Sequence, residues 1–303
     1  MQYPVLFWTG FHVLILGLLC IDLFVFHKKN RVISFKKACL LSGFWIAIAL
    51  LFNYFLYLYF GSSTALQFLT GYVIEKSLSV DNLFLFLVIF SQFQVPSLYQ
   101  YKILFWGILG VLFFRITLIL LGITLITLFH WMFYLFGVLL LFSGFKLFFQ
   151  KKNGKEITKS RIFSWLKSHL PTTASYRGDR FFLMEKGKWK VTPLFLVLLM
   201  IESTDIVLAL DSIPAVFAVT TDPFIVYTSN ILAILGLRSL YFVLASSMDK
   251  LRYLKSGLAL ILVFIGGKML FSDLISFSTL ESLAVIGSIL TVTIVISLVH
   301  GKK

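Results

Sequence analysis

The stretch GYVIEKSLSVDN, residues 71–82, determines how this chain must fold. It places two carboxylates, Glu75 and Asp81, inside the otherwise apolar run 66–90. A run of about 20 apolar residues is long enough to cross a bilayer as a helix. A carboxylate at the centre of such a helix costs at least about 2.5 kcal/mol, so these two acids require a physical reason to be there.

The composition of the whole chain is that of a membrane protein. Its 303 residues are 59% hydrophobic and 13% charged, with a mean hydropathy of +0.95. A soluble domain of this size carries about twice that share of charged residues. The net charge of +14 lies mostly in short loops rather than on an aromatic-rich surface, which argues against nucleic-acid binding. Two cysteines, Cys20 and Cys39, are too few for a disulfide framework or a thiolate metal site.

The apolar runs predict an all-α polytopic membrane protein with about nine transmembrane helices. The predicted spans are 5–26, 38–60, 66–90, 103–122, 125–149, 193–214, 224–246, 256–273 and 283–299. The fourth and fifth spans are so close in sequence that they must form a hairpin, with its turn expected near 122–127.

The distribution of basic residues predicts the orientation of these spans. All but four of the 27 Lys and Arg fall in the segments 28–37, 102, 146–190, 250–255 and 302–303. If all of these segments face the cytoplasm across a bacterial inner membrane, the number of spans is odd, the N-terminus is outside and the C-terminus is cytoplasmic. The basic loop 150–190 is expected to lie along the membrane surface.

Five carboxylates lie deep inside the predicted spans and form two groups, one on the third span and one on the sixth. They are Glu75, Asp81, Glu202, Asp205 and Asp211. One explanation is charge pairing with the basic residues that also fall inside spans, namely Lys76, Arg115, Arg238 and Lys268. Acids clustered on two helices exceed what helix association requires, so the pattern favours a functional site.

The spacing of the acids indicates an internal repeat. Asp81 follows Glu75 by six residues, as Asp211 follows Asp205, which is about 9 Å along a helix. The third span runs inward and the sixth outward, which is typical of inverted repeats with an ion site near the midplane. The single transmembrane domain 1–303 then consists of peripheral spans 1–60, repeat one at about 66–149, the cytoplasmic loop 150–190, repeat two at about 193–273 and a last span 283–299.

The donor atoms in both acidic stretches indicate a hard divalent cation. Neutral oxygens come from Ser79, Asn82, Ser203, Thr204 and Ser212. Carboxylate, amide and hydroxyl oxygens suit Mn²⁺, Mg²⁺ or Ca²⁺, and neither stretch contains a histidine. The predicted metal-binding set is Glu75, Asp81, Asn82, Glu202, Asp205 and Asp211, with Asp22, Ser79 and Ser212 as additional candidates.

In its sharpest form, the hypothesis has four acids, Glu75, Asp81, Asp205 and Asp211, coordinating one cation between the third and sixth spans. Pro214 and the stretch 79–82 are expected to break their helices and to free backbone carbonyls as further ligands. Asp22 lies near the end of the first span, where a carboxylate that reaches the interface is an equally good explanation.

At these residues the chain resembles the TerC family of integral membrane proteins. The resemblance is carried by the stretches IDLFVFHK (21–28), TGYVIEKSLSVDN (70–82), LFWGILG (104–110), Arg115, ESTD (202–205), ALDSIPA (209–215), TTDPFIVYTSN (220–230) and GLR (236–238). It implies export of Mn²⁺ as substrate, with no tightly bound cofactor, and a link to metal homeostasis and tellurium resistance. The sequence leaves the oligomeric state open.

Two other functions compete with transport as explanations of the sequence. A membrane-embedded enzyme would also use paired carboxylates, but the chain contains no motif of a metalloprotease, a serine hydrolase or a phosphate-binding loop. A membrane scaffold that supports metal homeostasis or secretion without transport requires no acids inside the membrane. The alternative to transport is therefore the scaffold, and neutralising Glu75 and Asp205 separates the two hypotheses.

Overall fold

The computed structural model describes residues 4–24, 34–149, 165, 168–173, 175–176, 178–185, 187–246, 253–274 and 277–300. These residues form an all-helical bundle with one small hairpin. The helices are α1 (Val5–Phe24), α2 (Phe35–Gln92), α3 (Ser97–Leu128), α4 (Met132–Phe149), α6 (Pro193–Phe217), α7 (Pro223–Leu235), α8 (Leu237–Ala245), α9 (Leu254–Leu270) and α10 (Thr279–His300). The strands are β1 (Phe182–Glu185) and β2 (Lys188–Val191).

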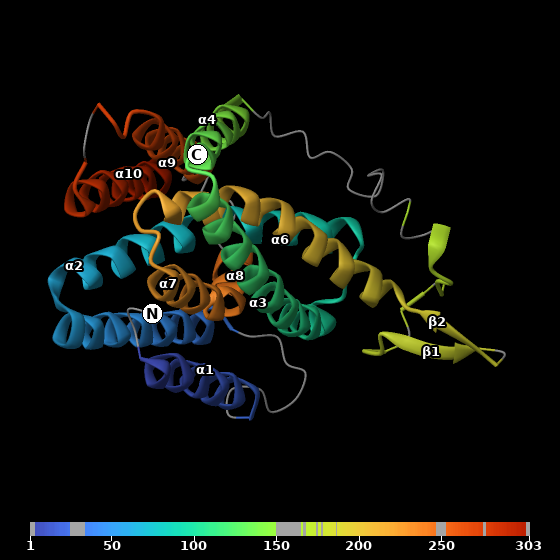
Figure 1. Ribbon diagram of the computed structural model, residues 1–303. Coiled ribbons are helices and arrows are strands. Elements are labelled where there is room, and N and C mark those ends of the chain that lie inside the picture. Colours follow the sequence, from blue (N-terminus) through green and yellow to red (C-terminus); the bar gives the residue numbers. More distant parts are fainter. Residues whose placement is uncertain are drawn as a thin grey trace.

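Helix α2 consists of two membrane-length segments. It has 58 residues, but Gly61 interrupts it with φ 84° and ψ 177°, a backbone conformation that only glycine adopts readily. Figure 1 shows that the two parts of α2 run back alongside each other from a turn at the left of the view. Its two parts correspond to the predicted spans 38–60 and 66–90.

The prediction of an all-α polytopic membrane protein is confirmed. Among the described residues, five helices are long and apolar enough to cross a membrane, and the pair α7 and α8, bent by 43°, makes a sixth. In this number of helices α2 is counted as one, although Gly61 divides it into two segments. With α2 as two segments and α7 with α8 as one, the described residues contain nine helical segments, which matches the predicted order of spans.

Two details of the prediction are wrong. The turn between α3 and α4 lies at 129–131 rather than near 122–127, because α3 continues to Leu128. Helix α6 also continues through Pro214 to Phe217, and α2 remains helical across 79–82. Pro214 has no N–H to donate to the carbonyl of Leu210, yet three further helical residues follow it before α6 ends at Phe217.

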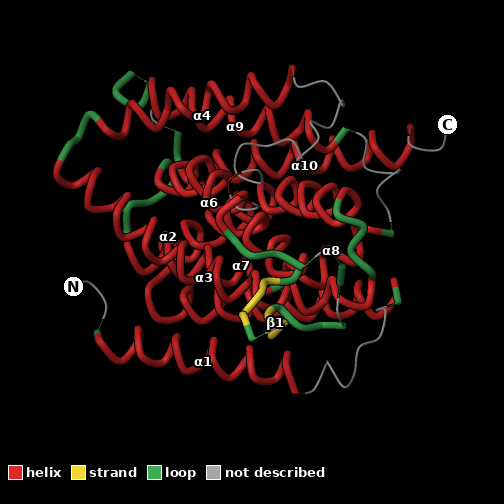
Figure 2. The backbone as a smooth tube through the Cα atoms, turned by 90° about the vertical axis from the view of Figure 1, so that its right-hand side faces the viewer, coloured by secondary structure: helices red, strands yellow, loops and turns green. Residues whose placement is uncertain are grey.

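The packing of the helices is symmetrical between the two predicted repeats. Helix α2 packs against α7 and α8, α6 packs against α3, and α4 packs against α9. Figures 1 and 2 agree that α4, α9 and α10 lie on one side of the central helices and α1 on the opposite side. The α4–α9 contact depends on small residues, since a Cβ at Gly144 would meet the carbonyl oxygen of Ala259 at 3.0 Å.

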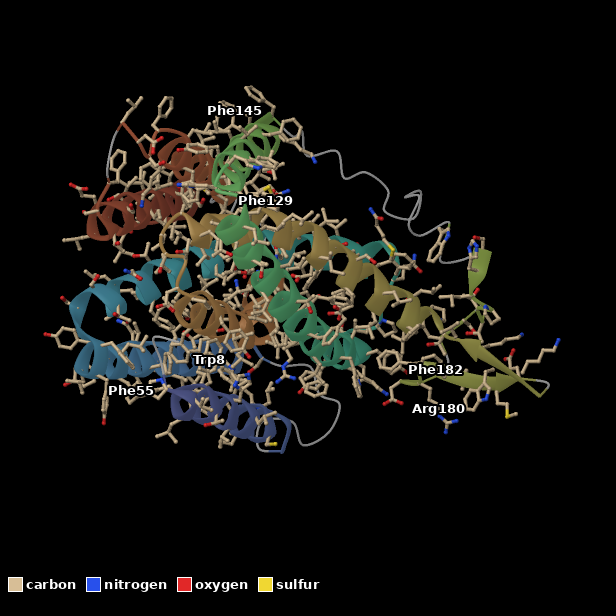
Figure 3. All side chains as sticks on the ribbon, viewed as in Figure 1. Trp8, Phe55, Phe129, Phe145, Arg180 and Phe182 are labelled. Carbon is tan, nitrogen blue, oxygen red and sulfur yellow. The ribbon has the colours of Figure 1, made fainter. Side chains whose placement is uncertain are left out.

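The outer surface of the bundle is apolar, as a lipid environment requires. Phe129 and Phe145 are 48% and 52% exposed, and Figure 3 shows Phe145 at the outer side of α4. The antiparallel hairpin β1–β2 lies at one end of the molecule, beyond the N-terminus of α6 (Figure 1). Arg180 and Phe182 lie at this end (Figure 3), in the second half of the predicted basic loop. Its first half, 150–164, lies outside the described residues.

Candidate functional site

A buried cluster of charged and polar side chains lies where α2, α3, α6 and α7 meet. We call it the central site and define it by Glu75 of α2, Arg115 of α3, Asp205 and Ser212 of α6, and Asn230 of α7. None of these side chains is more than 2% exposed. The cluster is therefore sealed from both lipid and water in this conformation.

The Arg115 guanidinium contacts an oxygen atom of every other member of the central site. Its Nη1 donates to Glu75 Oε1 at 2.6 Å and to Ser212 Oγ at 2.7 Å. Nη1 also donates to Asn230 Oδ1 at 3.4 Å, and Nε donates to Asp205 Oδ2 at 3.4 Å. Two carboxylates and one guanidinium leave the site with one net negative charge when all three are ionised.

Amide and hydroxyl groups hold the two carboxylates in place. Asn230 Nδ2 donates to Glu75 Oε2 at 2.9 Å, and Ser79 Oγ lies 3.5 Å from Glu75 Oε1. On the other side, Asn82 Nδ2 donates to Asp205 Oδ1 at 3.3 Å. Because buried ions are costly unless their hydrogen bonds are satisfied, these contacts stabilise the charged forms of both acids.

The contacts show that α2 and α6 run antiparallel, as the inverted-repeat hypothesis requires. Asn82, the later residue on α2, pairs with Asp205, the earlier residue on α6. Glu75, the earlier residue on α2, lies with Ser212, the later residue on α6, around the same Arg115 nitrogen. The two helices thus cross with the central site spread over about two helical turns.

Asp81 of α2 and Asp211 of α6 face a cavity on the opposite side of the crossing of these two helices. We call it the acidic cavity; its volume is about 220 Å³. Its polar lining consists of Asp81, Asn82, Ser143, Lys146, Asp211, Ser212 and Lys255. Asp211 Oδ1 accepts a hydrogen bond from Ser143 at 2.7 Å, whereas Asp81 Oδ1 is buried with no hydrogen-bond partner among the described residues.

Two residues belong to both the cavity and the central site. Asn82 lines the cavity and donates to Asp205, and Ser212 lines the cavity and accepts from Arg115. The cavity also reaches the end of the bundle where α4 finishes and α9 begins, because Lys146 and Lys255 line it there. Among the described residues that line the cavity, Asn82 and Ser212 thus connect it to the central site.

Glu202 lies apart from both groups. It is on the same helix as Asp205, and its carboxylate rests against the backbone of α3, where a Cβ at Gly110 would meet Oε1 at 2.3 Å. Glu202 Oε2 is buried without a hydrogen-bond partner among the described residues. A buried carboxylate oxygen in this state is costly.

The other basic residues predicted to pair with the acids have different contacts. Lys76 Nζ donates to the backbone carbonyl of Ala233 at 3.0 Å, and Lys268 Nζ donates to Ser282 Oγ at 2.9 Å. Arg238 lies over the ring of Tyr101 at 4.5 Å. The ion pairs of the central site therefore depend on Arg115.

The arrangement differs from one shared site with four carboxylates. Within the part of the chain that the structure describes, no three acidic, histidine or cysteine side chains form a metal-ligand group. Glu75 and Asp205 surround Arg115, whereas Asp81 and Asp211 line the acidic cavity. The antiparallel crossing explains this, because residues six apart on each helix face different neighbouring helices. The side chain of Asp22 lies outside the described residues.

Other predicted oxygen donors also turn away from the site. Ser203 and Thr204 donate to the carbonyls of Leu199 and Met200, one turn earlier in α6. Asn230, in contrast, belongs to the central site although it was not among the predicted ligands. The run Thr228-Ser229-Asn230, three fully buried polar residues in an apolar helix, was the signal that could have revealed it.

The comparison with known proteins agrees with this architecture. Residues 60–303 match the family described as "Integral membrane protein TerC family". The chain belongs to the TerC family. The match covers every residue of the central site and of the acidic cavity. No solved structure matches the chain.

Several TerC relatives cover nearly the whole length of the chain. An "uncharacterized membrane protein" of Myxococcus xanthus is 46% identical over 97% of this chain and 92% of its own length. The "Putative membrane-bound redox modulator Alx" of Escherichia coli K12 is 42% identical over 96% of this chain and 94% of its own. A membrane protein of Rickettsia bellii is 42% identical over 97% of both chains.

Proposed function

We propose that this protein exports a hard divalent cation, with Mn²⁺ as the first candidate, across the bacterial inner membrane. The observation that carries the proposal is the set of four oxygen atoms around Arg115. They come from two carboxylates, one amide and one hydroxyl, and all four point at one position buried between four helices. A cation already occupies that position, in the form of the guanidinium.

The chemistry of these four atoms supports a hard ion rather than a soft one. Carboxylate and carbonyl oxygens suit Mn²⁺, Mg²⁺ and Ca²⁺, whereas Zn²⁺ and Cu⁺ favour histidine or cysteine. The cysteines Cys20 and Cys39 are exposed on α1 and α2, and the central site is buried. Two carboxylates also match the charge of a divalent cation.

The acidic cavity supplies a route to the site. It is lined by Asp81 and Asp211 and reaches the ends of α4 and α9, next to the basic segments predicted to face the cytoplasm. A cation that enters from this side meets the cavity acids first and then Asn82 and Ser212 at the boundary of the central site. If this side faces the cytoplasm, as the basic segments predict, the cavity lies where an exporter would admit its substrate.

Metal uptake by everted inner-membrane vesicles tests the proposal, because export from the cell becomes uptake into the vesicle. Vesicles containing the protein are expected to accumulate Mn²⁺ faster than vesicles without it, and to favour Mn²⁺ over Zn²⁺. Each ion, including Ca²⁺ and Mg²⁺, is measured with and without a proton gradient, since acids that bind metal or protons in turn offer a route to exchange. Equal uptake in both vesicle types would contradict the proposal.

A matched variant separates transport from the scaffold hypothesis. The double substitution Glu75→Gln and Asp205→Asn keeps the size and shape of both side chains, replaces one acceptor oxygen of each by an NH2 donor and removes their charge. If the protein transports, the variant no longer protects cells from excess Mn²⁺, even when its amount in the membrane is matched to that of the wild type. Full protection at equal expression would favour the scaffold.

A further inference from the structure

We propose that Arg115 is a built-in counter-ion of the transport site, which the substrate cation displaces on binding and which Glu202 then receives. The inference rests on the proposed function and adds a residue that moves during the cycle. Its starting point is geometric: the hydrogen-bond donors of Arg115 contact four oxygen atoms suited to a divalent cation. The guanidinium and the substrate cation therefore compete for one position.

Electrostatics prevents both cations from occupying the site together. Glu75 and Arg115 are fully buried and Asp205 is 2% exposed, so water does not screen repulsion between two cations among them. With the guanidinium in place, the two carboxylates leave one negative charge. With a divalent cation instead, the charges of the site cancel. Binding thus replaces one counter-ion by another, and the carboxylates keep a positive partner throughout.

The displaced guanidinium needs a new partner, because an unpaired buried charge costs several kcal/mol. Glu202 offers one, since its Oε2 is buried and lacks a hydrogen-bond partner among the described residues. Glu202 also lies close enough to Asp205 for the two acids to interact electrostatically. Its carboxylate rests against α3 at Gly110, on the N-terminal side of Arg115.

The direction of the Arg115 side chain favours this transfer. Side chains on a helix point toward its N-terminus, and Gly110 precedes Arg115 by five residues, or about 7.5 Å along α3. Because Gly110 has no side chain, the Glu202 carboxylate can lie directly against α3; a Cβ at this position would overlap it. Arg115 Nη2 is already without a hydrogen-bond partner among the described residues, so it is the group that can pair first with Glu202.

A tethered counter-ion gives the empty transporter a way to return. After the substrate leaves, the guanidinium moves back between Glu75 and Asp205, and the two acids never face each other unpaired inside the membrane. The same two acids exposed to water would need no such counter-ion, because water would hydrate and screen their charges. Because the guanidinium is covalently part of the chain, Glu75 and Asp205 regain a positive partner without binding a second ion from solution.

Calorimetric titration of Mn²⁺ into the purified full-length protein in detergent tests the displacement. Arg115→Gln removes the competing cation, so its Kd for Mn²⁺ is expected to fall at least about tenfold below that of the wild type, because charged hydrogen bonds no longer oppose binding. Glu202→Gln removes the receiving carboxylate and is expected to raise the Kd about tenfold. Lys268→Gln is the matched control, because it removes a cation of a membrane span that is hydrogen-bonded to Ser282.

The outcomes separate this inference from the proposed function. If the wild type binds Mn²⁺ and Arg115→Gln binds it more weakly, Arg115 supports the ligands and the displacement is wrong, while the transport function stands. If the wild type binds no divalent cation, both proposals fail. Should Arg115→Gln not fold, Glu202→Gln decides alone: an unchanged Kd would rule out transfer of the guanidinium to Glu202.

Discussion

The central site and the acidic cavity are built from the same sequence pattern but have different surroundings. Each takes one acid from α2 and one from α6, six residues from the acids of the other. Helix α3 supplies Arg115 to the central site and seals it, whereas α4 and α9 flank the cavity and leave about 220 Å³ open. The spacing brings the acids together in pairs, and the neighbouring helices decide whether a pair contacts a buried cation or faces an open cavity.

The largest expected effect comes from removing a charge of the central site. Asp205→Asn should reduce Mn²⁺ uptake by everted vesicles about a hundredfold, because a charged hydrogen-bonded group contributes about 3 kcal/mol and each 1.4 kcal/mol is tenfold. Asp179→Asn is the control, since Asp179 pairs with Lys102 at an exposed position. Wild-type transport by Asp205→Asn at equal expression would exclude the central site from transport.

The α4–α9 wall of the cavity is expected to respond through stability. Gly144→Ala places a Cβ 3.0 Å from the carbonyl oxygen of Ala259 and 2.8 Å from Val263 Cγ2, so the helices must separate. We expect a loss of about 1–3 kcal/mol, seen as a lower midpoint of thermal unfolding in detergent. Gly267→Ala meets nothing within 4 Å and should leave the midpoint unchanged or raise it. Equal midpoints for both variants would contradict the close packing.

A smaller effect is expected from the acids of the cavity. Asp211→Asn should lower the rate of Mn²⁺ uptake about fivefold and leave the Kd of the central site nearly unchanged, because Asp211 lines the route rather than the position of the ion. Ser143→Ala removes only the hydrogen bond to Asp211 and should have a weaker effect in the same direction. A loss as large as that of Asp205→Asn would mean that all four acids share one ion.

The smallest expected effect concerns the cations of the cavity. Lys255→Gln should lower the KM for Mn²⁺ about twofold, since one positive charge no longer repels the ion and a partly exposed charge contributes less than about 1 kcal/mol. The effect should decrease at high salt, because salt screens it. Lys102→Gln, whose partner Asp179 is exposed, serves as the control in the same vesicles. A higher KM for Lys255→Gln would show that this lysine orders the cavity instead.

The helices and the acids of the site could be predicted from the sequence, whereas the grouping of the acids could not. Runs of apolar residues predict spans because a bilayer imposes a minimum length. The break at Gly61 lies between two predicted spans, but the continuation of α6 through Pro214 depends on packing. Arg115 was one of four candidate partners, and only the contact of α3 with α6 selects it.

The sequence by itself determined that this chain lies in a membrane and that two of its helices carry carboxylates at matching positions. Both conclusions follow from transfer free energies: apolar groups are costly in water and acids are costly in lipid. These costs depend on the residue type and not on the neighbours that the fold supplies. Only the tertiary structure decided that Asn230 joins the site, that Glu202 stays apart and that Arg115 pairs with both Glu75 and Asp205. Such pairings depend on the rotation and crossing of whole helices, and these are set by the packing of all their neighbours together.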